Sequence, residues 1–133
     1  ALCASQWHKS LSYKDKYFGG GMKYASDFQK KFDYDPPYQS AESSAALLVF
    51  KDAFERANSF DTKKVRDALA ATDMQTFYGN IKFAEGGQNV SKPMVLFQVI
   101  CNDDGSKCEN KVVAPLKWAS AELVHPIPKW SDR

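Results

Sequence analysis

Histidine is scarce in this sequence, and this scarcity limits the metal and catalytic sites that the chain can form. The two histidines, His8 and His125, lie far apart in the chain, and neither has a second ligand at the spacing of a zinc site. The glycine–x–serine–x–glycine turn of hydrolases is missing, and so is a cysteine–histidine signature. The residues therefore predict a protein that is not an enzyme and that uses no metal and no cofactor.

Long apolar runs and a strong excess of one charge are also missing. The longest apolar run, Ala45–Phe50, is far shorter than the ~20 residues of a membrane-spanning helix. The 18 Lys and Arg residues against 16 Asp and Glu give a net charge of +2, and the lysines are dispersed. Nucleic acid is therefore not expected as a partner. The first residues lack the regions of a signal peptide and are typical of a strand that other residues precede.

The glycine cluster Gly19–Gly21 lacks the features of a phosphate-binding loop. Neither the Walker spacing with its Lys-Ser/Thr pair nor the dinucleotide fingerprint is present. Apolar residues instead recur here at helical spacing, namely at Phe18, Met22, Ala25, Phe28 and Phe32. We expect a helix from Tyr17 to Phe32 with a weak first turn, because each glycine costs ~1 kcal/mol relative to alanine in a helix.

Proline, serine and asparagine mark the limits of a second helix. Pro36-Pro37 stops the first helix and holds the chain extended. Ser40 is a natural N-cap for a helix over Ala41–Ala57, and Asn58 is a plausible C-terminal cap. This helix is apolar nearly all round, so we expect it to be buried on most sides.

A third helix and a strand follow. Asp61 or Thr62 caps the helix, whose inner stripe consists of Val65, Ala68, Leu69 and Thr72. Within residues 76–89 the side chains alternate, with Phe77, Gly79, Ile81 and Phe83 on one face. That period of two predicts a half-buried strand. Gly86-Gly87 then predicts a reversal of the chain, because glycine tolerates positive φ.

The three cysteines form an odd count. Cys101 and Cys108 bracket a polar tip that contains the turn dipeptide Asp104-Gly105, between two apolar runs. A hairpin of this kind brings its arms within disulfide reach if the register is right. We expect a Cys101–Cys108 bridge, with two unpaired thiols as the alternative. Cys3 is then the remaining thiol, and we expect it to be buried in a first strand over Ala1–Gln6.

The order of these elements is strand, three helices and two or three further strands, ending with a strand from Pro93 to Cys101 and its hairpin partner. Such an order predicts an α/β layered arrangement in a single domain of 133 residues. The sheet has few strands to cover a helix as apolar as Ala41–Ala57, so we expect a large apolar surface around Leu47, Val49, Phe50 and Phe54 that packs against another segment or a second copy of the chain.

Several stretches, taken in this order, resemble the C-terminal part of the periplasmic solute-binding proteins of ABC transporters. The most similar group is the branched-chain amino acid (leucine/isoleucine/valine-binding) family. The stretches are the helix entry from Tyr38 to Ala57, "VRDALAATD", "TFYGNIKF" with "GQN", Lys92-Pro93-Met94, and the ending Pro128-Lys129-Trp130. The similarity runs across nearly the whole chain.

The resemblance implies part of a bilobal (type I) α/β clamp, in which each lobe is a sheet with flanking helices and the ligand is held at the hinge. Members of the family are more than twice as long as this chain. Residues 1–133 are therefore expected to be a single C-terminal segment that contributes to the lobes and the hinge. The rest of the fold then comes from a missing N-terminal portion or from a second copy in a dimer.

The entry of the second helix is the first candidate for the ligand site. A helix N-terminus offers free N–H groups and a positive dipole to a carboxylate. The resemblance implies that this entry faces the cleft, which assigns Tyr38, Glu42 and Ser43 to the ligand. Glu42 has two interpretations: it binds the ammonium group of a ligand, or it only complements the helix dipole.

Two aromatic residues complete the candidate site. Trp7 follows the first strand, with Gln6 and His8 beside it, at the place where ligand sites of α/β proteins usually lie. It either forms a wall of the ligand pocket or packs in the core. Tyr78 likewise has two interpretations, packing and ligand contact.

These observations predict the periplasmic ligand-binding component of an ABC transporter, which captures a small amino acid or a related carboxylate for uptake. Its expected macromolecular partner is the membrane permease of the transporter. The alternative is the ligand-sensing ectodomain of a receptor with the same fold.

Overall fold

The computed structural model describes residues 1–127 and Lys129, and it has the α/β architecture expected from the sequence. Of the ending, Pro128 and Trp130–Arg133 lie outside the described residues. The elements are β1 (Leu2–Ser5), β2 (Lys14–Asp15), β3 (Gly19–Gly20), α1 (Gly21–Phe32), α2 (Tyr38–Ala57), α3 (Thr62–Ala70), β4 (Asp73–Gln75), β5 (Asn80–Lys82), β6 (Val95–Cys101), β7 (Cys108–Ala114) and the short 3-10 helix η1 (Leu116–Trp118). None of the described helices is both long and apolar enough to cross a membrane.

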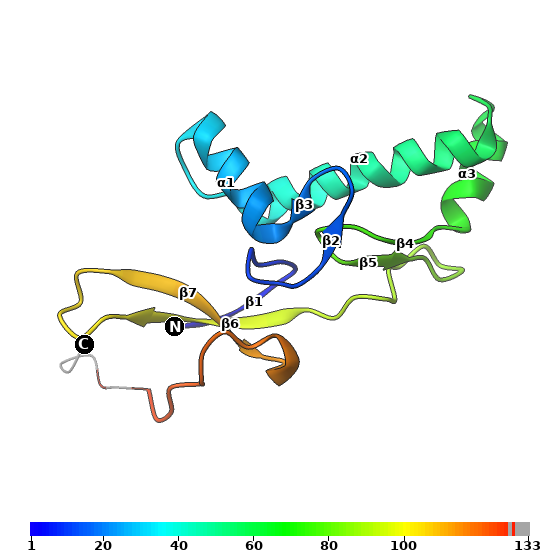
Figure 1. Ribbon diagram of the computed structural model, residues 1–133. Helices are drawn as coiled ribbons and strands as arrows, with labels where there is room; N and C mark the ends of the chain where they lie inside the picture. Colours follow the sequence, from blue (N-terminus) through cyan, green and yellow to red (C-terminus); the bar gives the residue numbers. More distant parts are fainter. Residues whose placement is uncertain (128, 130–133) are drawn as a thin grey trace.

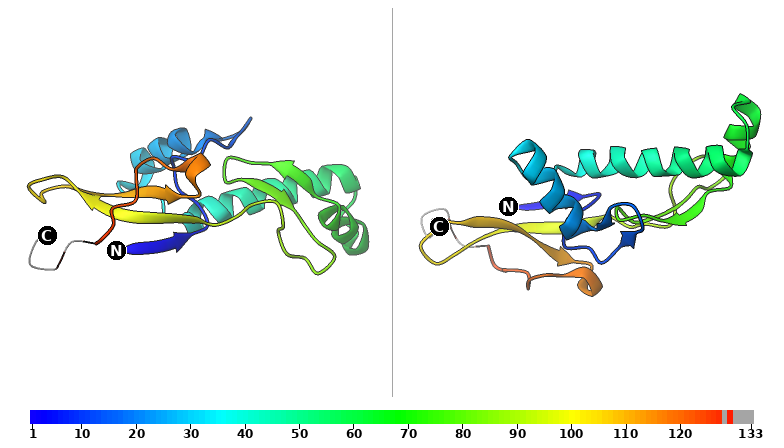
Figure 2. Two further views of the ribbon diagram at one scale, coloured as in Figure 1. Left: turned by 90° about the horizontal axis from the view of Figure 1, so that it is seen from below. Right: turned by 45° about the horizontal axis from the view of Figure 1, so that its top comes forward.

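The elements form two layers of different composition (Figures 1 and 2). One layer is a three-stranded sheet with the order β1-β6-β7. The other consists of the helices together with the β4–β5 hairpin, which lies along α2. All strand pairs in the described residues are antiparallel, unlike the parallel sheets of a complete α/β layer. The two layers are joined by the segments that follow β1 and precede β6.

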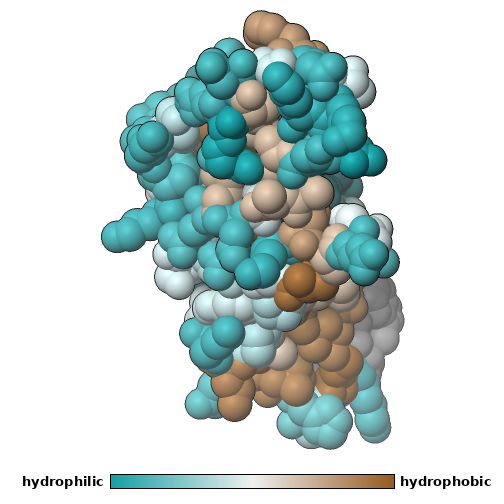
Figure 3. Space-filling model, turned by 90° about the vertical axis from the view of Figure 1, so that its right-hand side faces the viewer, coloured by the Kyte–Doolittle hydropathy of each residue, from teal (hydrophilic) through white to brown (hydrophobic). Residues whose placement is uncertain are grey.

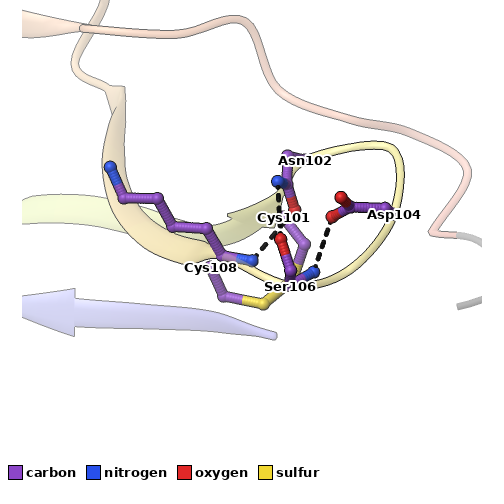
Figure 4. Close-up of a disulfide and its surroundings, with 6 residues drawn as sticks. Cys101, Asn102, Asp104, Ser106 and Cys108 are labelled. Atoms are coloured by element: carbon purple, nitrogen blue, oxygen red, sulfur yellow. Dashed lines mark hydrogen bonds between the residues drawn. A yellow bond between two sulfur atoms is a disulfide. The ribbon is translucent and has the colours of Figure 1, made fainter.

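The predicted disulfide is present at the tip of the β6–β7 hairpin (Figure 4). Cys101 and Cys108 are directly paired in the strand register. The tip is closed by side-chain bonds within the polar turn: the Asp104 carboxylate accepts from the Ser106 N–H at 2.8 Å, and the Asn102 amide donates to the Ser106 hydroxyl at 3.1 Å. The local sequence signals for this turn were therefore sufficient to predict it.

The first strand forms as expected, but its predicted burial is wrong. Leu2 and Cys3 are exposed, and only Ser5 of this strand is buried. The reason is topological. β1 pairs only with β6, so one of its edges is open, and no described helix covers these side chains. Hydrophobic side chains in a strand are buried only when another layer packs on them.

The first helix begins four residues later than predicted, at Gly21. Gly19 and Gly20 instead pair with β2 as a short strand, and Gly19 has a φ of +70°. The buried face of α1 is formed by Gly21, Tyr24 and Ala25. The predicted stripe is wrong at Met22 and Phe32, which are exposed. Tyr24 replaces them at the core because it stacks on Phe77 at 4.3 Å, a contact that helical spacing alone does not reveal.

The second helix begins at Tyr38, so the prediction of Ser40 as its N-cap is wrong. Pro37 is the N-cap residue, and its carbonyl accepts from the Ser40 N–H at 3.0 Å. Proline fixes φ close to the helical value, so the chain can turn into the helix immediately after it. The predicted end at Asn58 is confirmed, with a left-handed φ of 43°.

One side of α2 is covered within this chain and the other is not. The covered side consists of Ala41, Ala45, Leu48, Val49 and Ala53. On the other side Leu47 is 67% exposed, Phe50 47% and Phe54 37%. The expectation that α2 is buried on most sides is therefore wrong for the chain by itself. Hydrophobic side chains also form a band on the side of the molecule seen in Figure 3.

The third helix agrees with its prediction. Asp61 is the N-cap, and its carboxylate accepts from the Lys64 N–H at 3.0 Å. Val65 is buried, and Thr72 is buried just beyond the helix end. Local capping chemistry and the 3.6-residue period were enough to predict this helix.

The predicted strand is wrong at Phe77 and confirmed only at β5 (Asn80–Lys82), because residues 76–79 form a turn between β4 and β5. Thr76 and Gly79 exchange two backbone hydrogen bonds, at 2.9 and 3.1 Å. Phe77 and Tyr78 are therefore both buried instead of alternating. The Gly86-Gly87 reversal is confirmed, with a φ of +83° at Gly87.

An aromatic core surrounds the 76–79 turn and joins the two layers. Phe77 is fully buried, with edge or tilted contacts to Trp7 and Phe18 in addition to the stack on Tyr24. The Asp15 carboxylate accepts from the Phe77 N–H at 2.7 Å and from the Phe18 N–H at 2.8 Å. This turn is held by residues from several distant parts of the chain, which makes its geometry specific.

Candidate functional site

The larger cleft lies between the three-stranded sheet and the linker that leads into α2. Its volume is about 820 Å³. The sheet side contributes Ser5, Phe97 and residues 107–111, and the opposite side contributes residues 7–10 and 35–38. The cleft is therefore bounded by both layers and by a segment that joins them, which is the usual position of a small-molecule site.

The charged side chains of this cleft are more often positive than negative. Lys9 pairs with Asp35 at 2.5 Å, across the opening between the 7–10 loop and the α2 linker. Glu109 accepts from both Lys107 and Lys111, at 2.7 and 2.5 Å, and these hydrogen bonds lower the pKa of Glu109 to about 2. Three lysines thus face two carboxylates, an arrangement that favours an anionic ligand.

His8 adds a polar but uncharged group to the same cleft. Burial lowers its pKa below the ordinary value, and the positive charge of Lys9 lowers it further. Its Nδ1 lies 2.8 Å from the Ser10 hydroxyl. Near neutral pH this imidazole is therefore better suited to hydrogen bonding than to supplying charge.

A second, smaller groove of about 350 Å³ runs along α2. It is lined mainly by apolar side chains of α2, α3 and the β4–β5 hairpin. Its polar side chains are Glu42, Tyr78 and Asn89. This groove is therefore an apolar surface with one carboxylate.

The structure divides the predicted site residues between these two depressions. Trp7 and Tyr38 line the cleft, Glu42 and Tyr78 line the groove, and Ser43 lines neither. Trp7 is only 4% exposed, and its indole N–H donates to the Phe77 carbonyl at 3.3 Å. Its main role is thus core packing, with one edge on the cleft. Ser43 is exposed on α2.

Tyr38 and Glu42 nevertheless affect Tyr78. Burial raises the pKa of the Tyr78 hydroxyl well above its ordinary value, and the nearby Glu42 and Tyr38 raise it further. Tyr78 is 6% exposed. It therefore stays protonated, as a hydrogen-bond donor at the end of the groove.

Lys92 lies beside Tyr78, although it lines neither the cleft nor the groove, and the sequence did not indicate it as a site residue. Its ammonium donates to the Gln6 carbonyl and lies 4.4 Å from the centre of the Tyr78 ring. Burial lowers its pKa to about 8, and Glu42 opposes this shift only in part. No local signal identifies such a lysine, because its hydrogen-bond partner Gln6 is 86 residues away in the sequence.

No metal centre is evident in the part of the chain that the structure describes. Histidine, cysteine, aspartate and glutamate side chains do not gather there in groups of three or more.

Comparisons with known proteins show the same fold. The model of a family described as "Periplasmic binding protein" matches residues 3–106. The chain is also similar to the crystal structure of a leucine-binding protein, LivK, from Thermotoga maritima, with a TM-score of 0.63 and 22% sequence identity. The match covers 83% of this chain and 29% of that protein, so the chain spans less than a third of its length.

Proposed function

Because the chain belongs to the periplasmic binding protein family, we propose that it is part of the ligand-binding component of an ABC transporter. In this proposal it captures a small amino acid or a related carboxylate in the periplasm and delivers it to the membrane permease. The observation that best supports a carboxylate ligand is the cleft between the two layers, where three lysines face two carboxylates. Proteins of this family are generally not enzymes, and nothing in the described residues favours the receptor alternative.

The arrangement of the layers supports a contribution to both lobes and to the hinge. In this proposal the sheet β1-β6-β7 is part of one lobe, and the helices with the β4–β5 hairpin are part of the other. The segments around Gln6 and Lys92 connect them. A ligand bound between the lobes contacts both, so that binding favours one relative position of the two lobes.

Within this proposal Tyr38, Glu42, Ser43, Trp7 and Tyr78 remain the candidate ligand contacts. Tyr38 and Trp7 provide aromatic surface at the cleft, and Glu42 provides the carboxylate for a ligand ammonium. Ser43 is the weakest candidate because it lines neither depression.

Replacing Glu42 by Gln tests the ammonium contact. We expect Glu42→Gln to weaken the binding of a zwitterionic amino acid by about tenfold to a hundredfold, since a charge-assisted hydrogen bond contributes ~1.5–3 kcal/mol. Glu42 is exposed, so the fold should be unaffected. Calorimetry with the complete protein measures the change. The matched control is Glu55→Gln on the same helix, which should bind as the wild type does. Equal affinities of wild type and Glu42→Gln would show that Glu42 complements the helix dipole and does not bind the ligand ammonium.

The exposed side of α2 supports a further partner within the same proposal, namely the missing N-terminal portion or a second copy of the chain. Phe60, beyond the C-terminal end of α2, is 90% exposed and packs on Phe54 at 5.5 Å. Together with Leu47 and Phe50 these side chains form an uncovered apolar surface. Surfaces of this kind usually mark an interface. Val49, which the sequence also assigned to this surface, is buried inside the chain.

Light scattering on the 133-residue chain tests this proposal. We expect dimers or larger species, together with binding of a hydrophobic dye, because each exposed large apolar side chain gains ~1.5–3 kcal/mol on burial. The double variant Leu47→Lys/Phe50→Lys should shift the chain towards the monomer and reduce dye binding. A wild-type monomer that unfolds cooperatively and binds no dye would contradict the proposal.

A further inference from the structure

The surroundings of Lys92 are unusual for a lysine, because its side chain is held along its whole length. Its stem packs so closely on Gly79 that a Cβ at this glycine would lie 2.1 Å from the Lys92 Cδ. Its ammonium donates to the Gln6 carbonyl, which lies on the other connecting segment, 86 residues away in the sequence. The lysine is thus directed into the junction of the two layers instead of into solvent.

The hydrogen bonds of this ammonium are incomplete. A lysine ammonium has three donors. One reaches the Gln6 carbonyl, and the Tyr78 ring, 4.4 Å away, faces the group. A carbonyl and a ring are both neutral. Neither partner therefore neutralises the protonated ammonium, which has donor capacity left for another acceptor.

The described part of the chain offers no anion at ion-pair distance from Lys92. Nine ion pairs are formed there, and Lys92 belongs to none of them. The charged and titratable groups near it are Glu42 and Tyr38 on α2 and Tyr78 in the 76–79 turn. Glu42 raises the pKa of Lys92 without contacting it at ion-pair distance, and burial is the larger effect. Burying a charge is costly unless an opposite charge accompanies it.

From this geometry we propose that Lys92 forms an anion subsite that binds a carboxylate at the junction of the two layers. The Gln6 carbonyl and the Tyr78 ring orient the ammonium, and the carboxylate accepts its remaining donors. This assignment rests on the proposed ligand-binding function and adds a second position for an acid group, because Lys92 lines neither the cleft with the three lysines nor the groove.

The carboxylate has two potential sources that share this chemistry. One is a bound amino acid, and the other is an Asp or Glu side chain of a segment that completes the fold. Two experiments separate them. The first tests the subsite and needs only the wild-type chain, and the second tests the source.

In the first experiment the ¹³Cε shifts of isotope-labelled lysines are followed by NMR between pH 6.5 and 10.5, in sodium acetate and in sodium chloride of equal ionic strength. A carboxylate bound beside the ammonium stabilises its charged form, so we expect acetate to raise the pKa of Lys92 by on the order of one unit. Lys82 is the internal control, because it is exposed and already paired with Asp73 at 2.6 Å. An unchanged pKa of Lys92 in acetate overturns the subsite.

In the second experiment calorimetry compares L-leucine with leucinamide, which lacks the carboxylate, on the complete wild-type protein and on Lys92→Met. A loss of about tenfold or more for leucine alone in the variant assigns the subsite to the ligand. Unchanged leucine binding, together with a positive acetate result, assigns it to a carboxylate side chain. If the wild type binds none of a panel of amino acids, the proposed function fails, while the acetate titration still decides the role of Lys92.

Discussion

Replacing Gly79 by Ala is expected to destabilise the chain by about 2–6 kcal/mol, through two effects that add. Gly79 has a φ of +152°, which residues with a Cβ rarely adopt and which costs ~1–3 kcal/mol. The new methyl group would also lie 2.1 Å from the Lys92 Cδ and 2.7 Å from its Cε. Overpacking of this kind costs a further ~1–3 kcal/mol. Lys92 must then leave its place beside Gln6 and Tyr78.

Urea unfolding at matched protein concentration measures this loss. Gly87→Ala is the matched control, because Gly87 also has a positive φ, +83°, but no atom lies within 4 Å of the position that its new methyl group would take. The double variant Gly79→Ala/Lys92→Ala should recover the stability that is lost through the clash with Lys92. The stability that is lost through the positive φ should remain lost. Equal losses for Gly79→Ala and Gly87→Ala would show that Lys92 moves aside at no cost.

Replacing Phe77 by Ala is the second large change. We expect it to lower the free energy of unfolding by about 3–5 kcal/mol and the Tm by on the order of 10–20 °C. The side chain is fully buried and contacts Tyr24, Trp7 and Phe18. Its removal leaves a cavity at the junction of the two layers. The main-chain bonds of residue 77 to Asp15 and Trp7 hold the turn in place, so the surroundings can collapse only in part.

Thermal unfolding followed by circular dichroism checks this prediction. Leu116→Ala removes a large apolar side chain from a position that is 88% exposed and lies outside the apolar surface of α2, and it should change stability by no more than about 0.5 kcal/mol. A similar Tm for the two variants would mean that the aromatic cluster is not the core of the isolated chain.

The contrast between Ser40 and Asp61 shows where helix signals succeed. Asp61 caps α3 as its residue type predicts, because the cap needs only an N–H three residues away. Ser40 is an equally good residue type, but Pro37 starts α2 first and places Ser40 inside the helix. Two signals of similar local strength competed, and the favourable backbone geometry of proline decided the boundary.

Among the candidate site residues, the sequence and the family resemblance indicated Trp7, Tyr38, Glu42, Ser43 and Tyr78 but not how they are grouped. The structure places Trp7 in the core and separates the cleft from the groove. Lys92 was missed, because its surroundings come from Gln6 and Tyr78. Local pattern rules examine a window of about 11–18 residues, so the contact with Gln6, 86 residues away, is outside their range.

The sequence by itself determined the disulfide hairpin, the end of α2 at Asn58, the start of α3 at Asp61, and the α/β class, because each depends on near neighbours or on the order of elements. Only the tertiary structure decided that residues 76–79 turn inward, that Cys3 is exposed and that Lys92 is directed into the junction. These features depend on which distant segments pack together. The free energy gained on burial depends on those contacts and not on the residue type alone.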